Sequence, residues 1–209
     1  MIVSDGDRGG PTQKVGGSIC LEFTNTLDDF NRPDQDDELQ TFADLIAWAQ
    51  GATLISDREA AEYALLAEDN PAAADAALRK AKDLRNALCS IFSSISAARS
   101  PSSTELEQVN AIIAEVRPHM VLNEQEAHFS WRWVSLGNTL EELVWPVAIS
   151  TAELLASSDV SRISECGSDD CTWLFIDSSK NHSRRWCEME TCGNRAKARR
   201  HYARAHGKD

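Results

Sequence analysis

Four cysteines near the C-terminus constrain this chain more than any other feature. They form two pairs with the same internal spacing, Cys166-x4-Cys171 and Cys187-x4-Cys192, separated by 15 residues. Two cysteines on a short turn can bind one metal ion together, and two such turns complete the tetrahedron of ligands that Zn²⁺ prefers. We therefore predict that these four thiolates bind one zinc ion. Because four protein ligands leave no open coordination position, the predicted zinc is structural and not catalytic.

A second ligand set competes with the four cysteines. Cys187 and Cys192, together with His201 and His206, resemble a finger with two cysteines and two histidines. The gap between Cys192 and His201 is shorter than the about 12 residues of the usual form. This set would also leave the first cysteine pair without a role, so the set of four cysteines is the favoured prediction.

Charge is distributed unevenly along the chain. The whole chain carries a net charge of −12, yet residues 176–209 hold nine lysines and arginines against four acids, so this tail is at +5 and the rest is at −17. Such asymmetry is typical of a chain whose basic end binds nucleic acid. Since the acidic part repels DNA, contact is predicted to be confined to the tail. The basic residues of the tail are Lys180, Arg184, Arg185, Arg195, Lys197, Arg199, Arg200, Arg204 and Lys208.

The N-terminal residues are polar and acidic, without the apolar segment of a secretory signal. No apolar run approaches the about 18 residues that a membrane helix needs. We therefore expect a soluble, cytoplasmic protein with no membrane partner. In a reducing cytoplasm, clustered cysteines are more often metal ligands than disulfides. Cys20 and Cys89 lie far from the cluster and are predicted to be small buried thiols.

Hydrophobic periodicity predicts a mostly helical domain over residues 15–160, after a disordered segment at residues 1–14. Capping-box patterns open three of its helices, at Ser56–Glu59, Ser102–Glu105 and Asn138–Glu141. The predicted helices cover residues 39–51, 56–67, 71–98, 102–116 and 138–156, the last one interrupted or kinked near Pro146.

The remaining parts of this domain follow other patterns. Apolar and polar residues alternate over residues 119–134, which predicts a β-hairpin. The apolar segment 16–27 fits a strand or a helix, and the acidic segment 28–38 is predicted to be a loop. Trp131, Trp133 and Trp145 are predicted to pack in the core, with an aromatic ligand pocket as the alternative.

Residues 161–209 are predicted to form a small zinc module, so that the fold class is α+β. Residues 172–176 are predicted to be a strand that pairs with a second strand at residues 185–188. Gly193 is expected to allow a tight turn before a helix at residues 194–206. Because such a short segment lacks a core of its own, the metal is expected to supply the missing stability.

The predicted helix 194–206 carries an apolar stripe between two basic flanks. The stripe of Ala198, Tyr202 and Ala205 is expected to pack on Trp173 or Phe175. Arginine suits the flanks of a nucleic-acid-binding helix, because its guanidinium binds phosphates and guanine edges with two hydrogen bonds. The flanks hold Lys197, Arg200 and Arg204 on one side, and Arg195, Arg199 and His206 on the other.

Three motifs in the tail resemble a known family. Phe175-Ile-Asp-Ser178, Ser183-Arg-Arg-Trp-Cys187 and Cys192-Gly-Asn-Arg195, followed by Lys197, are similar to the CGNR zinc finger over about residues 166–204. By this resemblance, Arg184, Arg185 and Arg195 occupy the basic positions of the family, and all four cysteines bind zinc. We expect Asp177 to pair with Arg184 or Arg185, and Asn194 to cap the helix or bond a thiolate.

The N-terminal region resembles the domain that often precedes this finger. Leu21-Glu-Phe-Thr-Asn-Thr-Leu27 and Leu45-Ile-Ala-Trp48 are similar to the opening of the ABATE domain. That family is described as stress-induced bacterial transcription regulators. The resemblance implies a DNA-binding regulator whose helical domain senses a small-molecule ligand or forms a homodimer. The predicted DNA contacts are Arg184, Arg185, Arg195, Lys197, Arg199, Arg200 and Arg204.

Two other functions compete with DNA binding. A zinc module of this size also suits an RNA- or protein-interaction module, and an exposed Trp186 would favour stacking on a single-stranded base. An enzyme is disfavoured, because the sequence has no phosphate-binding glycine-rich loop, no His-Glu-x-x-His and no serine elbow. We expect the acids of residues 28–38 to form a solvated loop, and the protein not to be an enzyme.

Overall fold

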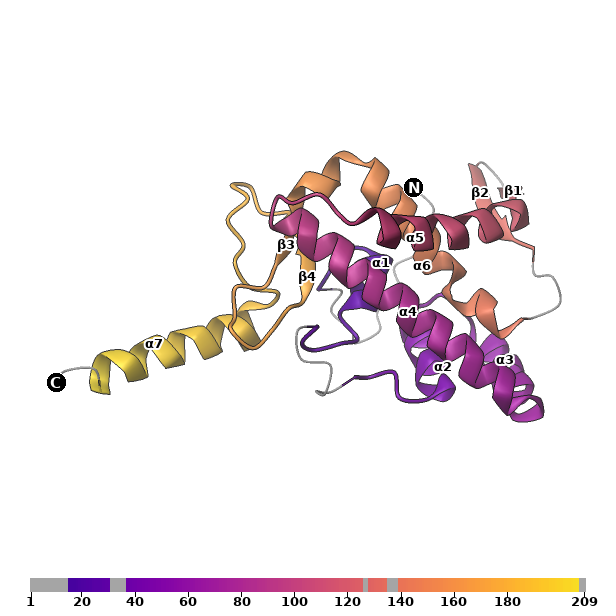
Figure 1. Ribbon diagram of the computed structural model, residues 1–209, viewed down its shortest axis with the longest axis horizontal. Helices are drawn as coiled ribbons and strands as arrows, with labels where there is room; N and C mark the ends of the chain where they lie inside the picture. The colour runs from indigo at the N-terminus through magenta and orange to yellow at the C-terminus, as the bar shows by residue number, and fades with distance from the viewer. Residues whose placement is uncertain (1–14, 31–36, 126–127, 135–138, 207–209) are drawn as a thin grey trace.

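A computed structural model describes residues 15–30, 37–125, 128–134 and 139–206 (Figure 1). Within some of these ranges the backbone alone is described, notably at Trp133 and from Arg204 to His206. The predicted disorder of residues 1–14 and the predicted cap at Asn138 lie outside the described residues.

A long central helix organises the N-terminal domain. This helix, α4 (Pro71–Ser96), packs against α1 (Ile19–Thr24), α2 (Phe42–Gly51), α3 (Asp57–Asp69) and α5 (Ser103–Val116), as Figure 1 shows. Leu84, Leu88 and Ile91 follow the helical repeat and are buried along its inner face. The predicted helical periodicity is confirmed here, and the segment 16–27 is resolved as the helix α1 with its following turn.

Side-chain caps set where the helices begin. The predicted capping box of Ser56 and Glu59 is confirmed at the start of α3, and a similar box of Thr41 and Asp44 opens α2. The predicted box at Ser102 is wrong, because that side chain makes no capping hydrogen bond. Since Thr41 serves as the cap, α2 begins at Phe42 and not at residue 39.

The predicted helix 138–156 is divided in two. A 3₁₀ helix, η2 (Leu140–Val144), opens on a capping box of Thr139 and Glu142, and α6 (Trp145–Ala156) follows it. Pro146 lies in the first turn of α6, where a missing N–H removes no helical hydrogen bond. The predicted interruption near Pro146 is therefore confirmed, and its form is a change of helix type at Trp145.

A β-hairpin projects at one end of the domain (Figure 1). After the short 3₁₀ helix η1 (Arg117–His119), β1 (Met120–Gln125) pairs with the antiparallel β2 (His128–Trp133), which confirms the predicted hairpin. Trp131 is 43% exposed, so its predicted core packing is wrong. Trp145 is buried and stacks on His119, with their ring centroids 4.9 Å apart.

The zinc module differs from the predicted one in its strand pairing. Following the 3₁₀ helix η3 (Ser158–Arg162), β3 (Ile163–Glu165) pairs with the antiparallel β4 (Leu174–Ile176). The predicted return strand at residues 185–188 is wrong. The physical reason is that Ile163 and Leu174 both join the main hydrophobic core, which places β3 beside β4.

The C-terminal helix points away from the rest of the molecule. A π-helical turn, η4 (Met189–Gly193), leads into α7 (Asn194–His206), which extends outward from the zinc module (Figure 1). Tyr202 is 65% exposed, so the predicted packing of its apolar stripe on Trp173 or Phe175 is wrong. Alanine at positions 198 and 205 provides too little apolar area to hold this helix against the module.

The body and the zinc module are joined by specific hydrogen bonds. The Asn25 amide donates to the carbonyl of Leu174 at 2.9 Å and accepts from its N–H at 2.8 Å. The hydroxyl of Ser93 on α4 donates to the Glu165 carboxylate at 2.7 Å. Asn25 is buried, and both the nitrogen and the oxygen of its side-chain amide form hydrogen bonds. It therefore orients β4 relative to the helical body.

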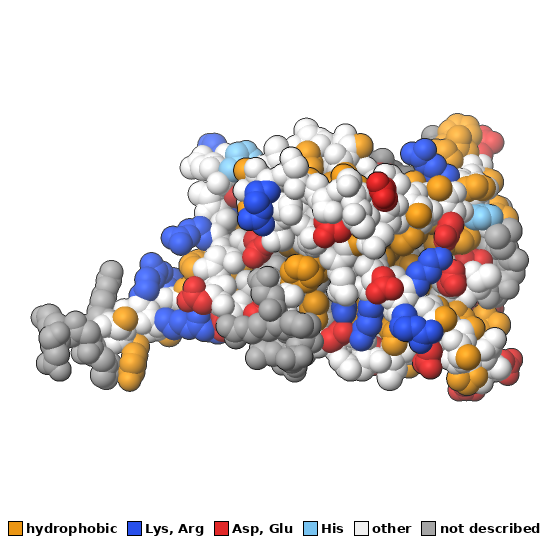
Figure 2. Space-filling model, in the orientation of Figure 1, with side chains coloured by type: hydrophobic (Ala, Val, Ile, Leu, Met, Phe, Trp, Pro, Cys, Tyr) orange, Lys and Arg blue, Asp and Glu red, His pale blue; other side chains and the backbone are white. Residues whose placement is uncertain are grey.

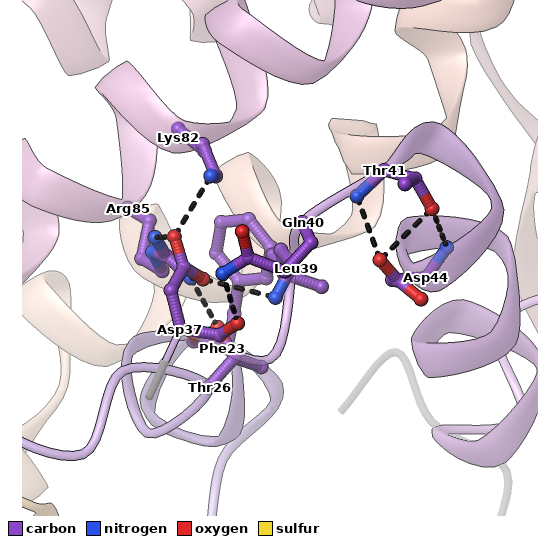
Figure 3. A network of polar contacts seen from close by, with 9 residues as sticks. All are labelled: Phe23, Thr26, Asp37, Leu39, Gln40, Thr41, Asp44, Lys82 and Arg85. Carbon is purple, nitrogen blue, oxygen red and sulfur yellow. Dashed lines mark hydrogen bonds and ion pairs between the residues drawn. The ribbon is translucent and has the colours of Figure 1, made fainter. Parts of the chain in front are cut away.

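A buried ion pair fastens the segment before α2 to the central helix (Figure 3). The Arg85 side chain is 3% exposed and donates to both carboxylate oxygens of Asp37, at 2.6 and 2.8 Å, and to the Thr26 hydroxyl at 2.9 Å. Lys82 adds a second cation at 2.8 Å from Asp37. Burial acts to raise the pKa of Asp37, but the hydrogen bonds from Arg85 and Lys82 outweigh it and hold this pKa well below its usual range.

Replacing Asp37 tests this network. Asp37→Asn should lower the free energy of unfolding at pH 7 by about 3–5 kcal/mol, because it leaves the buried Arg85 without its countercharge. Since the folded pKa of Asp37 lies below the unfolded value, the carboxylate stabilises above about pH 4, and this contribution is lost as the pH falls toward the folded pKa. Urea unfolding of both proteins at several pH values measures the difference.

A matched control comes from the same central helix. Asp75 on α4 is exposed and makes no hydrogen bond or ion pair with a described residue, so Asp75→Asn should change stability by about 0.5 kcal/mol or less. Equal effects of the two substitutions would contradict the role of the Asp37 network.

Candidate metal centre

The four predicted cysteine ligands converge on one point. All four Sγ atoms lie within 4.8 Å of one another, and every one of the four residues is buried. Sγ of Cys187 lies 3.7 Å from that of Cys171 and 3.5 Å from that of Cys192. A tetrahedral Zn²⁺ with Zn–S bonds of about 2.3 Å places its sulfurs about 3.8 Å apart. The donor set therefore fits a structural zinc ion, and all six cysteines of the chain are free of disulfides.

Each cysteine pair lies on its own turn. Cys166 follows β3 directly, and its N–H donates to the Trp173 carbonyl at 2.9 Å, so the first pair occupies the loop between β3 and β4. Cys187 precedes η4, and Cys192 lies within it. The first turn is thus the end of a hairpin, and the second is the start of the C-terminal helix. Zinc bound here connects α7 to the sheet.

Hydrogen bonds favour the thiolate form at the first ligand. The Cys187 N–H donates to Sγ of Cys166 at 3.4 Å. Hydrogen bonds from the thiols of Cys171 and Cys187, followed by this amide, lower the pKa of Cys166, and the same contacts with Cys166 raise the pKa of Cys171 and Cys187. Because the thiolate is the form that binds metal, zinc binding releases the protons that these thiols share.

Arg195 bridges the zinc ligands and the first turn. Its guanidinium donates to Sγ of Cys192 at 3.1 Å and to the Asp170 carboxylate at 3.1 Å. Arg199, one helical turn later, donates to the same carboxylate at 2.7 Å. Four thiolates around Zn²⁺ leave a net negative charge, which a guanidinium at this distance offsets. The Asp170 carboxylate thereby holds α7 to the loop of the first cysteine pair.

Arg184 points into the module. Its guanidinium donates to the carbonyls of Trp186, Val15 and Cys187, and its central carbon lies 4.1 Å from the centroid of the Phe175 ring. These contacts hold the chain leading to the second cysteine pair. Arg185, by contrast, is exposed, and its guanidinium lies 5.3 Å from the Trp186 ring centroid.

Asp177 and Asn194 have other partners than predicted. The Asp177 carboxylate accepts from the backbone N–H groups of Ser179 at 2.8 Å and Arg184 at 3.0 Å, and from neither guanidinium. The hydrogen bonds from Ser179 are the main cause of its lowered pKa. Asn194 donates to the Glu190 carbonyl at 2.9 Å and bonds no thiolate. Both residues therefore shape the chain around the second cysteine pair.

Gly193 lies in close contact with the side chains of Met189 and Trp186. A Cβ atom at this position would lie 2.5 Å from Sδ of Met189 and 3.2 Å from the Trp186 ring. The predicted turn is present as η4, but the φ of Gly193 is not in the left-handed range, so the turn does not depend on the backbone freedom of glycine. The glycine instead lets the turn of the second pair pack against Trp186.

The remaining predicted residues lie along α7. Lys197 and Arg200 are exposed, and neither forms an ion pair with a described residue. His201 is also exposed and lies outside the thiol cluster, so the alternative set of two cysteines and two histidines is wrong. The side chain of Arg204 lies outside the described residues. The role of Asp170 was not predicted from the sequence, because no local pattern pairs it with an arginine 25 residues later.

The fold and the site define a zinc protein in which a four-cysteine structural centre follows a helical domain. Residues 162–205 match the family model of the CGNR zinc finger. Residues 17–158 match the ABATE model, described as "Putative stress-induced transcription regulator". Because this second match spans more than half of the chain, the protein belongs to the ABATE family. A search of curated proteins found no match. Among the helices of the described ranges, none is long and apolar enough to cross a membrane.

Zinc content tests the ligand set. The purified protein should contain about one zinc ion per chain, and Cys187→Ser should lose most of it, because a missing thiolate opens the tetrahedron. Cys89→Ala is the matched control, since Cys89 is a buried thiol outside the cluster, and it should retain its zinc. Metal analysis of the three proteins measures this, and equal zinc in Cys187→Ser and the parent would contradict the ligand set.

A second test concerns the guanidinium beside the thiolates. Arg195→Gln should weaken zinc binding about 10-fold, because a hydrogen bond to a ligand sulfur is lost. Competition with a chromophoric chelator measures the affinity. Lys197→Gln removes a charge from the same helix without touching a ligand, and it should leave the affinity unchanged. Equal zinc affinities of the two variants would exclude this role for Arg195.

Proposed function

We propose that this protein is a zinc-dependent DNA-binding transcription regulator of the bacterial cytoplasm, in which α7 contacts the duplex. The observation that carries the proposal is the position of α7, which extends away from the body and presents Lys197 and Arg200 to solvent (Figure 1). Figure 2 shows lysines and arginines gathered over the zinc module and the start of this helix, on the face in view. The family descriptions of both matched regions support the same function.

The dimensions of α7 suit the major groove. Its 13 residues make a rod of about 20 Å, and the groove of B-DNA is about 12 Å wide and accepts an α-helix. The zinc ion fixes the base of this rod, while the Asp170 carboxylate holds Arg195 and Arg199 toward the module. A rigid base is what positions the outer part of the helix against a duplex.

We sort six of the seven predicted DNA contacts into three groups by their interactions, and the seventh, Arg204, has its side chain outside the described residues. Arg185, Lys197 and Arg200 are exposed and form no ion pair with a described residue, so we assign them the first phosphate contacts. Arg195 and Arg199 are bonded to Asp170, so a phosphate would compete with that carboxylate for them. Arg184 is engaged with backbone carbonyls, and we assign it the support of the loop.

Two acids limit the orientation of DNA. Glu190 is exposed and Glu188 is half-buried, with its carboxylate bonded to the Thr191 hydroxyl at 3.1 Å. Both lie at the turn of the second cysteine pair and would repel phosphate. The duplex is therefore proposed to lie along α7 at Lys197 and Arg200, with Arg185 as a contact at its edge.

The competing functions have less support. Trp186 is half-buried against the cysteine cluster, whereas base stacking on RNA needs an exposed ring. We propose no catalytic role for zinc, because four thiolates occupy every coordination position. The helical domain is proposed to sense a small-molecule ligand or to mediate homodimerisation.

Salt dependence of DNA binding tests this function. Binding of a fluorescein-labelled random duplex should weaken steeply with salt, because phosphate contacts release counterions. Lys197→Ala and Arg200→Ala should each weaken binding and reduce the slope of log K against log salt by about 1. Fluorescence anisotropy at several salt concentrations measures both quantities.

The control variant is on the body. Arg79 on α4 is exposed and makes no ion pair with a described residue, so Arg79→Ala should leave the slope unchanged. An unlabelled RNA stem of equal length should compete less well than duplex DNA. A slope near zero in the parent protein, or stronger competition by RNA, would count against DNA as the partner.

A further inference from the structure

A cavity lies where the helical domain meets the zinc module. Its volume is about 440 Å³, which falls within the about 300–1,000 Å³ of small-molecule sites. Trp48 on α2 lines it from one family-matched region, and Trp173, just before β4, lines it from the other. A molecule bound in this cavity would therefore touch both parts of the protein at once. Neither family description assigns it a ligand.

The walls of the cavity combine apolar surface with negative charge. Val15, Ile19, Leu39 and Ala47 join the two tryptophans in the apolar part. The lining also holds the polar side chains of Asn25 and Thr26 and three carboxylates, and the described lining residues include no lysine or arginine. The carboxylates are Glu22, Glu38 and Asp44. This combination favours a ligand with an apolar body and a positive charge, since tryptophan faces and carboxylates both attract cations.

The three carboxylates are not equivalent. Asp44 is engaged by the N–H and the hydroxyl of Thr41, at 2.6 and 2.8 Å, and Glu22 accepts from the N–H of Gly16 at 2.8 Å. Glu38 makes no side-chain hydrogen bond or ion pair with a described residue. Burial, and then the neighbouring charge of Asp28, raise the pKa of Glu38. A cation beside Glu38 would stabilise its carboxylate against both effects, as the charge of Arg85 already does in part.

The wall that carries Glu38 is held at both ends (Figure 3). On one side, Asp37 is bonded to Arg85, and it also accepts from the N–H of Leu39 at 2.9 Å. On the other, Thr41 and Asp44 form the capping box that opens α2. The segment between these anchors is therefore fixed before any ligand arrives, and a preformed wall lowers the entropy lost on binding.

The cavity is also connected to the zinc ligands. Asn25 lines it and holds both backbone groups of Leu174. Trp173 lines it too, its carbonyl accepts from the N–H of Cys166, and its indole N–H is buried without a hydrogen-bond partner among the described residues. A ligand that touches Trp173 thus lies one hydrogen bond away from a cysteine that binds zinc.

We propose that this cavity binds a small organic cation, a protonated amine on an aromatic or aliphatic body. The amine lies against Glu38, and the body contacts Trp48 and Trp173. The site stands on its own geometry. Its consequence, that the bound cation changes the DNA affinity of the zinc module, rests on the proposed function above.

Three probes with the same phenylethyl body and different charge test the site. Phenethylamine is positive at neutral pH, 2-phenylethanol is neutral and 3-phenylpropionate is negative. Calorimetric titration of the zinc-loaded full-length protein should show saturable binding of phenethylamine, with an affinity about 10-fold or more above that of 3-phenylpropionate. Glu38→Gln should remove most of the preference for phenethylamine over 2-phenylethanol. Glu107→Gln, an exposed carboxylate on α5, is its matched control and should keep the preference.

A second pair of variants places a charge inside or outside the cavity. Ala47 lines the cavity and Ala43, on the same helix, does not, although both are exposed. Ala47→Arg should abolish phenethylamine binding, and Ala43→Arg should preserve it. Absence of saturable binding, equal binding of the anion, or equal behaviour of the two arginine variants would overturn the site.

Duplex binding with and without saturating phenethylamine separates this site from the proposed function. A severalfold change in duplex affinity that Ala47→Arg removes is the expected result. If phenethylamine binds as described and the protein binds no duplex at all, the site stands and DNA regulation is wrong. If the cavity variants leave phenethylamine binding unchanged, the site is wrong whatever the duplex result.

Discussion

The convergence of four thiolates on one zinc ion is the interaction on which the C-terminal part of this protein depends. Phe175 is the one large apolar side chain in the described part of the module that is fully buried within the cysteine cluster. Such a small core is insufficient for a stable fold, so the metal supplies the missing free energy. The zinc joins the end of the β3–β4 hairpin to the start of α7. Without it, α7 would be held to the turn of the first cysteine pair by the ion pairs of Arg195 and Arg199 with Asp169 and Asp170.

Polar contacts, as well as apolar packing, connect the helical body to the zinc module. Asn25 holds β4 by both backbone groups of Leu174, while the buried pair of Asp37 and Arg85 fastens the segment that enters α2. These two anchors flank one cavity, whose tryptophans come from both parts of the chain. Contiguous contacts therefore connect the helical domain to the zinc ligands through this cavity.

Local patterns predicted those features that depend on nearby residues. The spacing of the cysteines identified all four zinc ligands, the helical repeat located the major helices, and alternation located the β1–β2 hairpin. Contacts between residues far apart in the sequence decided the strand pairing and the orientation of individual side chains. The strand that pairs with β4 comes from residues 163–165, because Ile163 is drawn into the main core. Arg184 resembles its neighbour Arg185 in sequence, yet carbonyl groups of three separate residues turn it inward.

The amino-acid sequence by itself determined the metal, its ligands, the α+β class and the basic character of the C-terminal helix, because each follows from residue types at fixed short spacings. The direction of α7, the pairing of Arg195 and Arg199 with Asp170, and the cavity between Trp48 and Trp173 were decided by the tertiary structure alone. The physical reason is distance along the chain. Contacts between residues separated by tens of positions depend on how whole elements pack, and no local pattern records them.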